Sequence, residues 1–253
     1  MSAITVERSE GVCRIQLSRP EKLNALNREM VDALLEVQQS LIEDPEIHVV
    51  VLSGQGRGFS AGADLTYISQ IYRDPIVARA FLNSLRDVIV NFERLEQPVI
   101  GAVHGFVLAG GLELMMGCDI VVAARSTRIG DQHMQRGFIP GGGNTQRIPW
   151  RISRVQALDL LLTGRWLTAN DALSMGLISR VVDDHDLGTE TERIALQLAS
   201  TSYSALKEVK RLTHLAHATP IAEGLELEID AVMRYYRDPA FVDALATFTE
   251  RPR

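Results

Sequence analysis

The sequence predicts an α/β fold with a mainly parallel sheet. Short β-branched runs recur along the chain, namely ITVER, VCRIQL, IHVVVLSG, PVIGAV, DIVVAA and ISRVV, and helical stretches separate the middle ones. This alternation of strands and helices is typical of parallel pairing with crossover connections. Three of the runs are apolar nearly throughout, which indicates strands covered on both faces.

Two long helices are predicted between these strands, and further helices follow them. Residues 27–44 carry apolar side chains at helical spacing. The next helix begins with Asp74 as its N-cap and Pro75 at its first helical position. From about Thr189 onward the pattern is almost only helical, and no Gly- or Pro-rich linker precedes it. We therefore predict an α/β core over residues 1–188 and a helical region over 189–253 that packs on the core or on a neighbouring subunit.

Composition excludes several classes of protein. The chain has 253 residues and a formal net charge of −6, which argues against a general nucleic-acid binder. The N-terminus has no apolar stretch of the kind found in signal peptides, and no apolar run reaches the length of a membrane span. The two cysteines, Cys13 and Cys118, form no C-x-x-C motif, so a disulfide framework or a zinc site is not expected. We expect a cytoplasmic protein.

The segment VVVLSGQGRGFSAGADL combines a strand with a glycine-rich turn. Its glycines at 54, 56, 58 and 62 give G-x-G-x-G, and no Gly-Lys-Ser/Thr follows. This spacing fits neither a dinucleotide fingerprint nor a P-loop. Gly58 and Gly62 permit a backbone that approaches a ligand closely, and a helix starting near Asp64 would direct free N–H groups at that ligand.

A second glycine-rich turn lies in HGFVLAGGLELMMGCD. A strand is predicted to end near Val103, and Gly110-Gly111 opens a helix. Two such turns after neighbouring strands meet at the carboxyl ends of a parallel sheet, where α/β proteins bind ligands. Two converging N–H groups there would form an oxyanion hole. The alternative is that the glycines only allow close helix–strand packing, and spacing alone favours this alternative.

Five motifs in order identify a family resemblance. They are SRPEKLNALN, GRGFSAGADL, HGFVLAGGLELMMGCDIVVAA, GFIPGGGNTQRIP and LLTGRWLTANDALSMGLISRVV. Together they resemble the enoyl-coenzyme A hydratase/isomerase (crotonase) family from about residue 5 to 185. The resemblance implies a spiral of β-β-α units with a C-terminal helical region used in trimerisation, and trimers that pair into hexamers. It implies an acyl thioester of coenzyme A as ligand and no metal or redox cofactor.

The resemblance also implies site residues by position. The backbone N–H groups of Ala63 and Gly110 match the oxyanion-hole donors. Two further segments match the coenzyme A site: Lys22, Leu23 and Ala25 in one, and Ala61, Asp64 and Leu65 in the other. Hydrogen bonds from the oxyanion donors stabilise the enolate that forms on the thioester oxygen, and one such donor is worth about 3 kcal/mol.

Glu113 stands out as a lone carboxylate in an apolar segment. It matches one of the two glutamates that flank the reacting carbons in the hydratases, where it would activate the attacking water. The alternative is a glutamate that caps its own helix N-terminus. The second glutamate is missing: His133 occupies its position, between Gln132 and Met134, and the nearest carboxylate is Asp131.

We predict an enoyl-CoA hydratase that adds water, with syn geometry, to a 2,3-enoyl thioester by means of Glu113 and His133. Imidazole exchanges protons near neutral pH, so a Glu–His pair is able to support hydration. The same enolate also leads to hydrolysis, decarboxylation, carbon–carbon cleavage (a lyase reaction) or isomerisation, and these outcomes stay open. The alternative from another class is a non-catalytic acyl-CoA binder on the same scaffold.

Overall fold

The computed structural model describes residues 2–249, with side chains through residue 246, and contains two sheets. The larger has the strand order β1-β2-β3-β4-β6-β9. Its strands are β1 (Ile4–Ser9), β2 (Val12–Leu17), β3 (Val49–Gly54), β4 (Val99–Val103), β6 (Ile120–Ala124) and β9 (Arg180–Val182). Only β1 pairs antiparallel, with β2, and the other neighbours are parallel. The predicted α/β class with mainly parallel pairing is confirmed.

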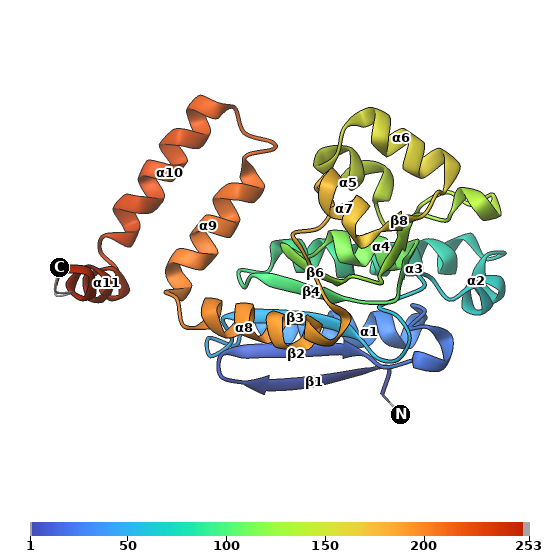
Figure 1. Cartoon of the computed structure of the whole chain (residues 1–253), viewed down its shortest axis with the longest axis horizontal. Helices are drawn as coiled ribbons and strands as arrows, with labels where there is room; N and C mark the ends of the chain where they lie inside the picture. Colours follow the sequence, from blue (N-terminus) through green and yellow to red (C-terminus); the bar gives the residue numbers. More distant parts are fainter. Residues whose placement is uncertain (1, 250–253) are drawn as a thin grey trace.

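Both faces of this sheet are covered (Figure 1). On one face, α1 (Arg28–Ile42) and α3 (Pro75–Arg94) pack against each other and close the main apolar core. On the other face, α8 (Leu187–Ala199) contributes Ile194 and Ala195 to a smaller cluster that contains Val49, Val51 and Ile100. Because β3 and β4 contact apolar residues on both sides, alternating polar positions are absent from them, as the sequence predicted.

A smaller sheet continues the spiral. It has the order β5-β7-β8, with β5 (Phe106–Leu108), β7 (Arg128–Gly130) and β8 (Leu167–Thr168). The chain passes from β4 in the large sheet to β5 in the small one and then into α4 (Gly110–Met116), which is a strand-strand-helix unit. Every residue of α4 is buried. This arrangement agrees with the predicted spiral of β-β-α units.

Local sequence fixes where the predicted helices begin. Asn27 caps α1 by accepting a hydrogen bond from Met30 N, and Asp74 caps α3, with Pro75 as its first residue. The remaining helices of the spiral are α2 (Leu65–Ile71), α5 (Asn144–Arg151), α6 (Arg154–Thr163) and α7 (Ala169–Met175), and there are short 3₁₀ turns at Pro20–Lys22 (η1), Met134–Arg136 (η2) and Asp184–Asp186 (η3).

The C-terminal helices α9 (Tyr203–Leu215), α10 (Ile221–Tyr235) and α11 (Pro239–Thr249) extend away from the spiral as an arm (Figure 1). Lys210 ties α9 to the sheet: its buried Nζ lies 2.8 Å from Asp119 Oδ2 and donates to the carbonyls of Phe92 and Gln97. The predicted helical tail is confirmed for the described residues. Its first helix, α8, covers the main sheet, and the division at residues 188 and 189 stays a prediction.

We expect Asn24→Ala to destabilise the fold by about 3 kcal/mol, because it leaves buried backbone groups without partners. The Asn24 side chain donates to the carbonyls of Gln55 and Gly58 and accepts from Arg19 N, each at 2.9 Å. Asn24 also adopts a left-handed backbone, with φ of 53°, which alanine tolerates less well. Urea unfolding measures the change. The exposed helical Asn170→Ala serves as the control, and an equal effect in both variants would contradict this role.

Candidate active site

The first feature of the site is the backbone N–H of Ala63, which the pairing with a neighbouring segment leaves free. Leu26 N donates to Gly62 O at 2.8 Å, and Asp64 N donates to Leu26 O at 2.9 Å. This is a parallel bridge between Leu26 and Ala63. In such a bridge the flanking residues of one partner make the hydrogen bonds, so the N–H of Ala63 points to the opposite side, away from Leu26.

The second feature is the start of α4. Gly110 is its first residue, so its N–H has no acceptor within the helix. Ala109 precedes it with φ of 48°, an uncommon value for alanine, and donates its own N–H to Gly130 O. This sharp bend turns the chain from β5 directly into the buried helix.

The loop that carries Gly62 and Ala63 touches the bend at Ala109 and Gly110. A Cβ on Gly62 would lie 2.6 Å from Gly110 N, and a Cβ on Gly110 would lie 3.2 Å from Ala63 N. Only glycine at position 62 lets the backbones approach this closely, because side chains there would clash with the neighbouring amide. The N–H groups of Ala63 and Gly110 therefore lie on adjacent segments of backbone.

The segments expected beside coenzyme A lie next to each other. Ala61 N donates to Leu23 O at 2.9 Å, which joins the segment 22–25 to the segment 61–65. Ser60 strengthens this junction, since its buried Oγ donates to Asn24 O and accepts from Gly62 N. Among the predicted contact residues, Lys22 and Leu65 are exposed, Leu23 and Ala61 are half-buried, and Ala25 and Asp64 are buried.

One expectation about this loop is wrong. From the sequence we expect the helix starting near Asp64 to offer free N–H groups to a ligand. Instead, the Asp64 side chain itself accepts from Thr66 N and Tyr67 N. Asp64 also pairs with Arg19 at 3.0 Å. Burial opposes the charge of Asp64, but Arg19 and these N–H groups outweigh it and lower the pKa of the carboxyl. The start of α2 is thus closed by its own cap.

Glu113 lies on the first turn of α4 and is 1% exposed. Its Oε1 accepts from Gly142 N at 2.8 Å and from Asn144 N at 3.3 Å, both outside its own helix. Burial raises the pKa of Glu113, against the lowering effects of His133 and of these two N–H groups. The carboxylate is therefore held from the glycine-rich segment and does not cap α4 by a hydrogen bond of its own.

His133 belongs to a buried polar cluster. Its Nδ1 lies 3.0 Å from Oδ1 of Asp131, which is fully buried. The same Oδ1 accepts from Asn144 Nδ2 at 2.7 Å. Burial lowers the pKa of His133, but the hydrogen bond and charge of Asp131, together with the charge of Glu113, outweigh burial and raise it. His133 and Glu113 thus attract each other across the site.

Two members of this cluster were not predicted to act. Asp131 was noted only as the nearest carboxylate, and no role was predicted for Asn144. The Asp–x–His spacing is a local signal for a turn in which the carboxylate accepts from the backbone two residues on, and Asp131 Oδ2 accepts from His133 N at 3.3 Å. Nothing local singles out Asn144, because the chain brings it to Asp131 from 13 residues away.

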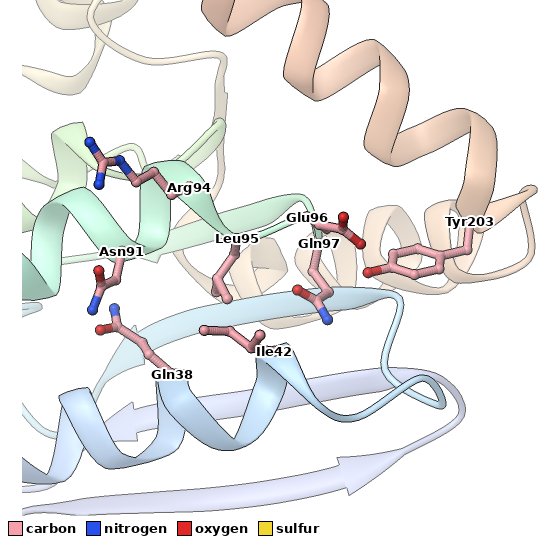
Figure 2. Close-up of a pocket in the computed structure, with 8 residues that line it drawn as sticks. All are labelled: Gln38, Ile42, Asn91, Arg94, Leu95, Glu96, Gln97 and Tyr203. Atoms are coloured by element: carbon pink, nitrogen blue, oxygen red, sulfur yellow. The ribbon is translucent and has the colours of Figure 1, made fainter. Parts of the chain in front are cut away.

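Two hollows on the surface lie apart from the free N–H groups of Ala63 and Gly110. Figure 2 shows the smaller one, of about 370 Å³, between Gln38 on α1, Asn91 on α3 and Tyr203 on α9. The larger one, of about 1080 Å³, lies between α9 and the helices α3 and α5. It borders the backbone of residues 141–143, the segment that holds Glu113. Neither lining includes Ala63, Gly110 or Glu113.

The other candidate groups have structural partners. His214 Nε2 lies 2.9 Å from Asp119 Oδ1, and the His217 ring stacks on Trp150. Both cysteines are buried and form no disulfide, and burial raises the pKa of Cys118 to about 12. Within residues 2–249, no group of three potential metal ligands comes together, and no helix is long and apolar enough to cross a bilayer.

The spiral fold, with two adjacent amides at the turn into α4 and a buried carboxylate on that helix, is that of the crotonase class. The model of the enoyl-CoA hydratase/isomerase family matches residues 7–253, and the chain belongs to this family. It is 34% identical to a probable enoyl-CoA hydratase of Mycobacterium bovis over 98% of this chain and 95% of the relative. It is 31% identical to the crotonyl-CoA hydratase of Syntrophomonas wolfei over 98% of this chain and 95% of that one.

A solved structure gives the same picture. The enoyl-CoA hydratase from Bacillus anthracis superimposes with a TM-score of 0.94 at 31% identity, over 98% of this chain and 96% of that one. The match includes nearly the whole chain, so the C-terminal arm is part of the shared fold. The predicted family and fold are confirmed.

We expect Glu113→Gln to stabilise the protein more at pH 8 than at pH 5. Burial raises the pKa of Glu113 above its ordinary 4.5, so the ionised form is penalised in the folded state. This penalty is absent at low pH and grows as the pH rises through the folded-state pKa. The difference in the free energy of unfolding between variant and wild type measures it, with the exposed Glu223→Gln as control. A stability difference between variant and wild type that does not change with pH would contradict the raised pKa of Glu113.

Proposed function

We propose that this chain is an enoyl-CoA hydratase that adds water, with syn geometry, across the 2,3 double bond of an enoyl thioester. The observation that carries the proposal is the contact between the two bends, which sets the free amides of Ala63 and Gly110 side by side. The hydratase names of the relatives at 31–34% identity support the reaction.

The reaction requires stabilisation of the thioester oxygen, removal of a proton from water and delivery of a proton to the α carbon. The thioester oxygen accepts from Ala63 N and Gly110 N, which stabilise the enolate as negative charge develops. The oxygen of a water molecule bonds to the β carbon, and Glu113 takes a proton from that water. A proton donor then delivers a proton to the α carbon, and we assign this role to His133. The raised pKa of Glu113 makes it a stronger base, and the raised pKa of His133 favours the imidazolium that donates the proton.

Coenzyme A is part of the substrate, and the chemistry requires no further cofactor. Its site is proposed along the joined segments 22–25 and 61–65, where exposed Lys22 supplies a positive charge for a phosphate. Asp64 serves this site as the cap of α2 and partner of Arg19. A cytoplasmic location stays a prediction.

Glu113→Gln is expected to lower kcat for hydration of crotonyl-CoA by about 10²- to 10⁴-fold, because glutamine cannot accept the proton of water. Loss of the enoyl thioester absorbance measures the rate. Calorimetry with butyryl-CoA, which has no double bond to hydrate, tests whether binding is retained. Glu93→Gln is the matched control, because Glu93 pairs with Arg147 beside the same glycine-rich segment without touching Glu113.

Negligible hydration by both wild type and Glu113→Gln, with tight thioester binding in each, would instead support a non-catalytic binder. Release of free coenzyme A from crotonyl-CoA by wild type would indicate a hydrolase. A panel of longer and branched enoyl thioesters then defines the acyl group.

We also propose that the chain forms a trimer, or a hexamer of two trimers, through the C-terminal arm. In the single chain, α10 and its C-cap expose an apolar stripe at helical spacing: Ile221, Leu225, Ile229, Val232 and Met233 on the helix, and Tyr236 at the cap. A contiguous apolar surface of this kind is typical of an interaction site. The large hollow beside α9 would accommodate part of a second copy, which would then contact the segment that holds Glu113.

Light scattering after gel filtration is expected to give a mass of three or six chains. The double substitution Leu225→Glu and Ile229→Glu places two charges in the apolar stripe and should shift the mass to that of a single chain. Asp230→Lys, an exposed charge reversal on the opposite face of the same helix, is the control and should keep the wild-type mass. A single-chain mass for wild type at micromolar concentration would refute the assembly.

A further inference from the structure

The strongest unexplained feature is the buried set of hydrogen bonds around Asp131. Its Oδ1 accepts from Asn144 Nδ2 at 2.7 Å and lies 3.0 Å from His133 Nδ1, while its Oδ2 accepts from His133 N at 3.3 Å. Gln132, between them, has φ of 56°, so the chain folds back and sets the imidazole over the carboxylate. A left-handed glutamine is strained, and such strain persists only where the surroundings impose it.

These contacts fix which nitrogen of His133 carries a proton. An ionised carboxylate only accepts hydrogen bonds, so Nδ1 must be the donor to Asp131 Oδ1. Nε2 is then the one ring nitrogen able to release or take up a proton during a reaction. Asn144 contacts the same carboxylate: Asn144 Nδ2 donates to Asp131, and the buried Oδ1 of Asn144 has no partner. The amide orientation is therefore set by the carboxylate.

Asn144 links this set to the rest of the site. Its backbone N donates to Glu113 Oε1 at 3.3 Å, and its Nδ2 also reaches Ala109 O at 3.4 Å. Ala109 is the residue immediately before the proposed oxyanion donor Gly110. One fully buried residue thus contacts the proposed base, the carboxylate that holds His133 and the bend that carries the oxyanion amide.

We propose that Asp131 and Asn144 are positioning residues that hold His133 with Nδ1 protonated, so that Nε2 delivers the proton to the α carbon. The inference rests on the proposed hydratase reaction. Water oxygen bonds to the β carbon, its proton passes to Glu113, and the electron pair of the double bond moves to the thioester oxygen. The enolate then takes the Nε2 proton at the α carbon. Exchange with solvent removes the proton from Glu113 and returns one to His133.

The charges around His133 set the direction of the pH dependence. Asp131 and Glu113 favour the imidazolium, and Arg136 on η2 opposes it. Helix α6 packs against η2, and its Asp159 is paired with Arg165. The proton donor must be protonated, so the rate falls as the pH rises through the pKa of His133. Removal of the Asp131 charge lowers that pKa and moves the falling limb of the profile to lower pH.

The first experiment combines pH profiles with a double-mutant cycle on crotonyl-CoA hydration. Asp131→Asn is expected to lower kcat by about 10- to 100-fold, as is typical when the orienting partner of a functional histidine is lost, and to shift the falling limb to lower pH with KM little changed. In a His133→Gln background, Asp131→Asn should change kcat less than about twofold, because Asp131 acts through His133. Asn144→Ala should lower kcat in the wild-type background and little in the His133→Gln background.

Asp186→Asn is the matched control, because it removes the carboxylate of an exposed His–Asp contact, 3.5 Å from His185 Nε2. It should keep the wild-type rate and profile. A fall in kcat for Asp131→Asn that is equally large with and without His133, and that leaves the profile unshifted, would overturn the proposal and assign Asp131 a purely structural role.

A second measurement does not depend on activity. Two-bond ¹H–¹⁵N spectra of the histidine rings report the tautomer directly, and His133→Gln assigns the signal. The neutral His133 ring is expected as the Nδ1–H form in wild type and as a mixture in Asp131→Asn. An Nε2–H form in wild type would overturn the proposal even with hydration observed. Absence of hydration together with the expected tautomer would refute the proposed function and leave the positioning of His133 intact.

Discussion

The contact between the loop after β3 and the bend before α4 is the constraint on which the site depends. Gly62 and Gly110 bring two backbones to a separation that leaves no room for a Cβ at Gly62. Around this contact the amides of Ala63 and Gly110 are left free, one because its neighbours make the bridge to Leu26 and the other because it begins a helix. In the proposed reaction these backbone donors need no reorganisation, which is why such donors are effective.

The same packing explains how a carboxylate is kept in an apolar helix. α4 is buried along its whole length, so Glu113 has little access to water. The N–H groups of Gly142, just before α5, and of Asn144, the first residue of α5, replace part of that lost solvation. Burial still raises the pKa of Glu113. Burial of Glu113 thus costs stability locally, and its raised pKa suits the proposed role as a base, as is common at reactive sites.

The proposed assembly would connect the C-terminal arm to the site. α9 is anchored by Lys210 to Asp119 and to two backbone carbonyls, so its position relative to the sheet is fixed. The hollow beside it reaches residues 141–143, whose backbone holds Glu113. A second copy in that hollow would stiffen the segment. Assembly through the arm and the geometry of the proposed base are then parts of one structural arrangement.

The sequence by itself determined the parallel α/β class, the capped starts of α1 and α3, the helical tail and the family, because these follow from local periodicity, caps and ordered motifs. It named the positions of Ala63, Gly110, Glu113 and His133. Only the tertiary structure decided that Asp64 pairs with Arg19 and that Asn144 joins Asp131, Glu113 and Ala109. Such long-range hydrogen bonds depend on how separate segments pack, and residue spacing along the chain carries no information about them.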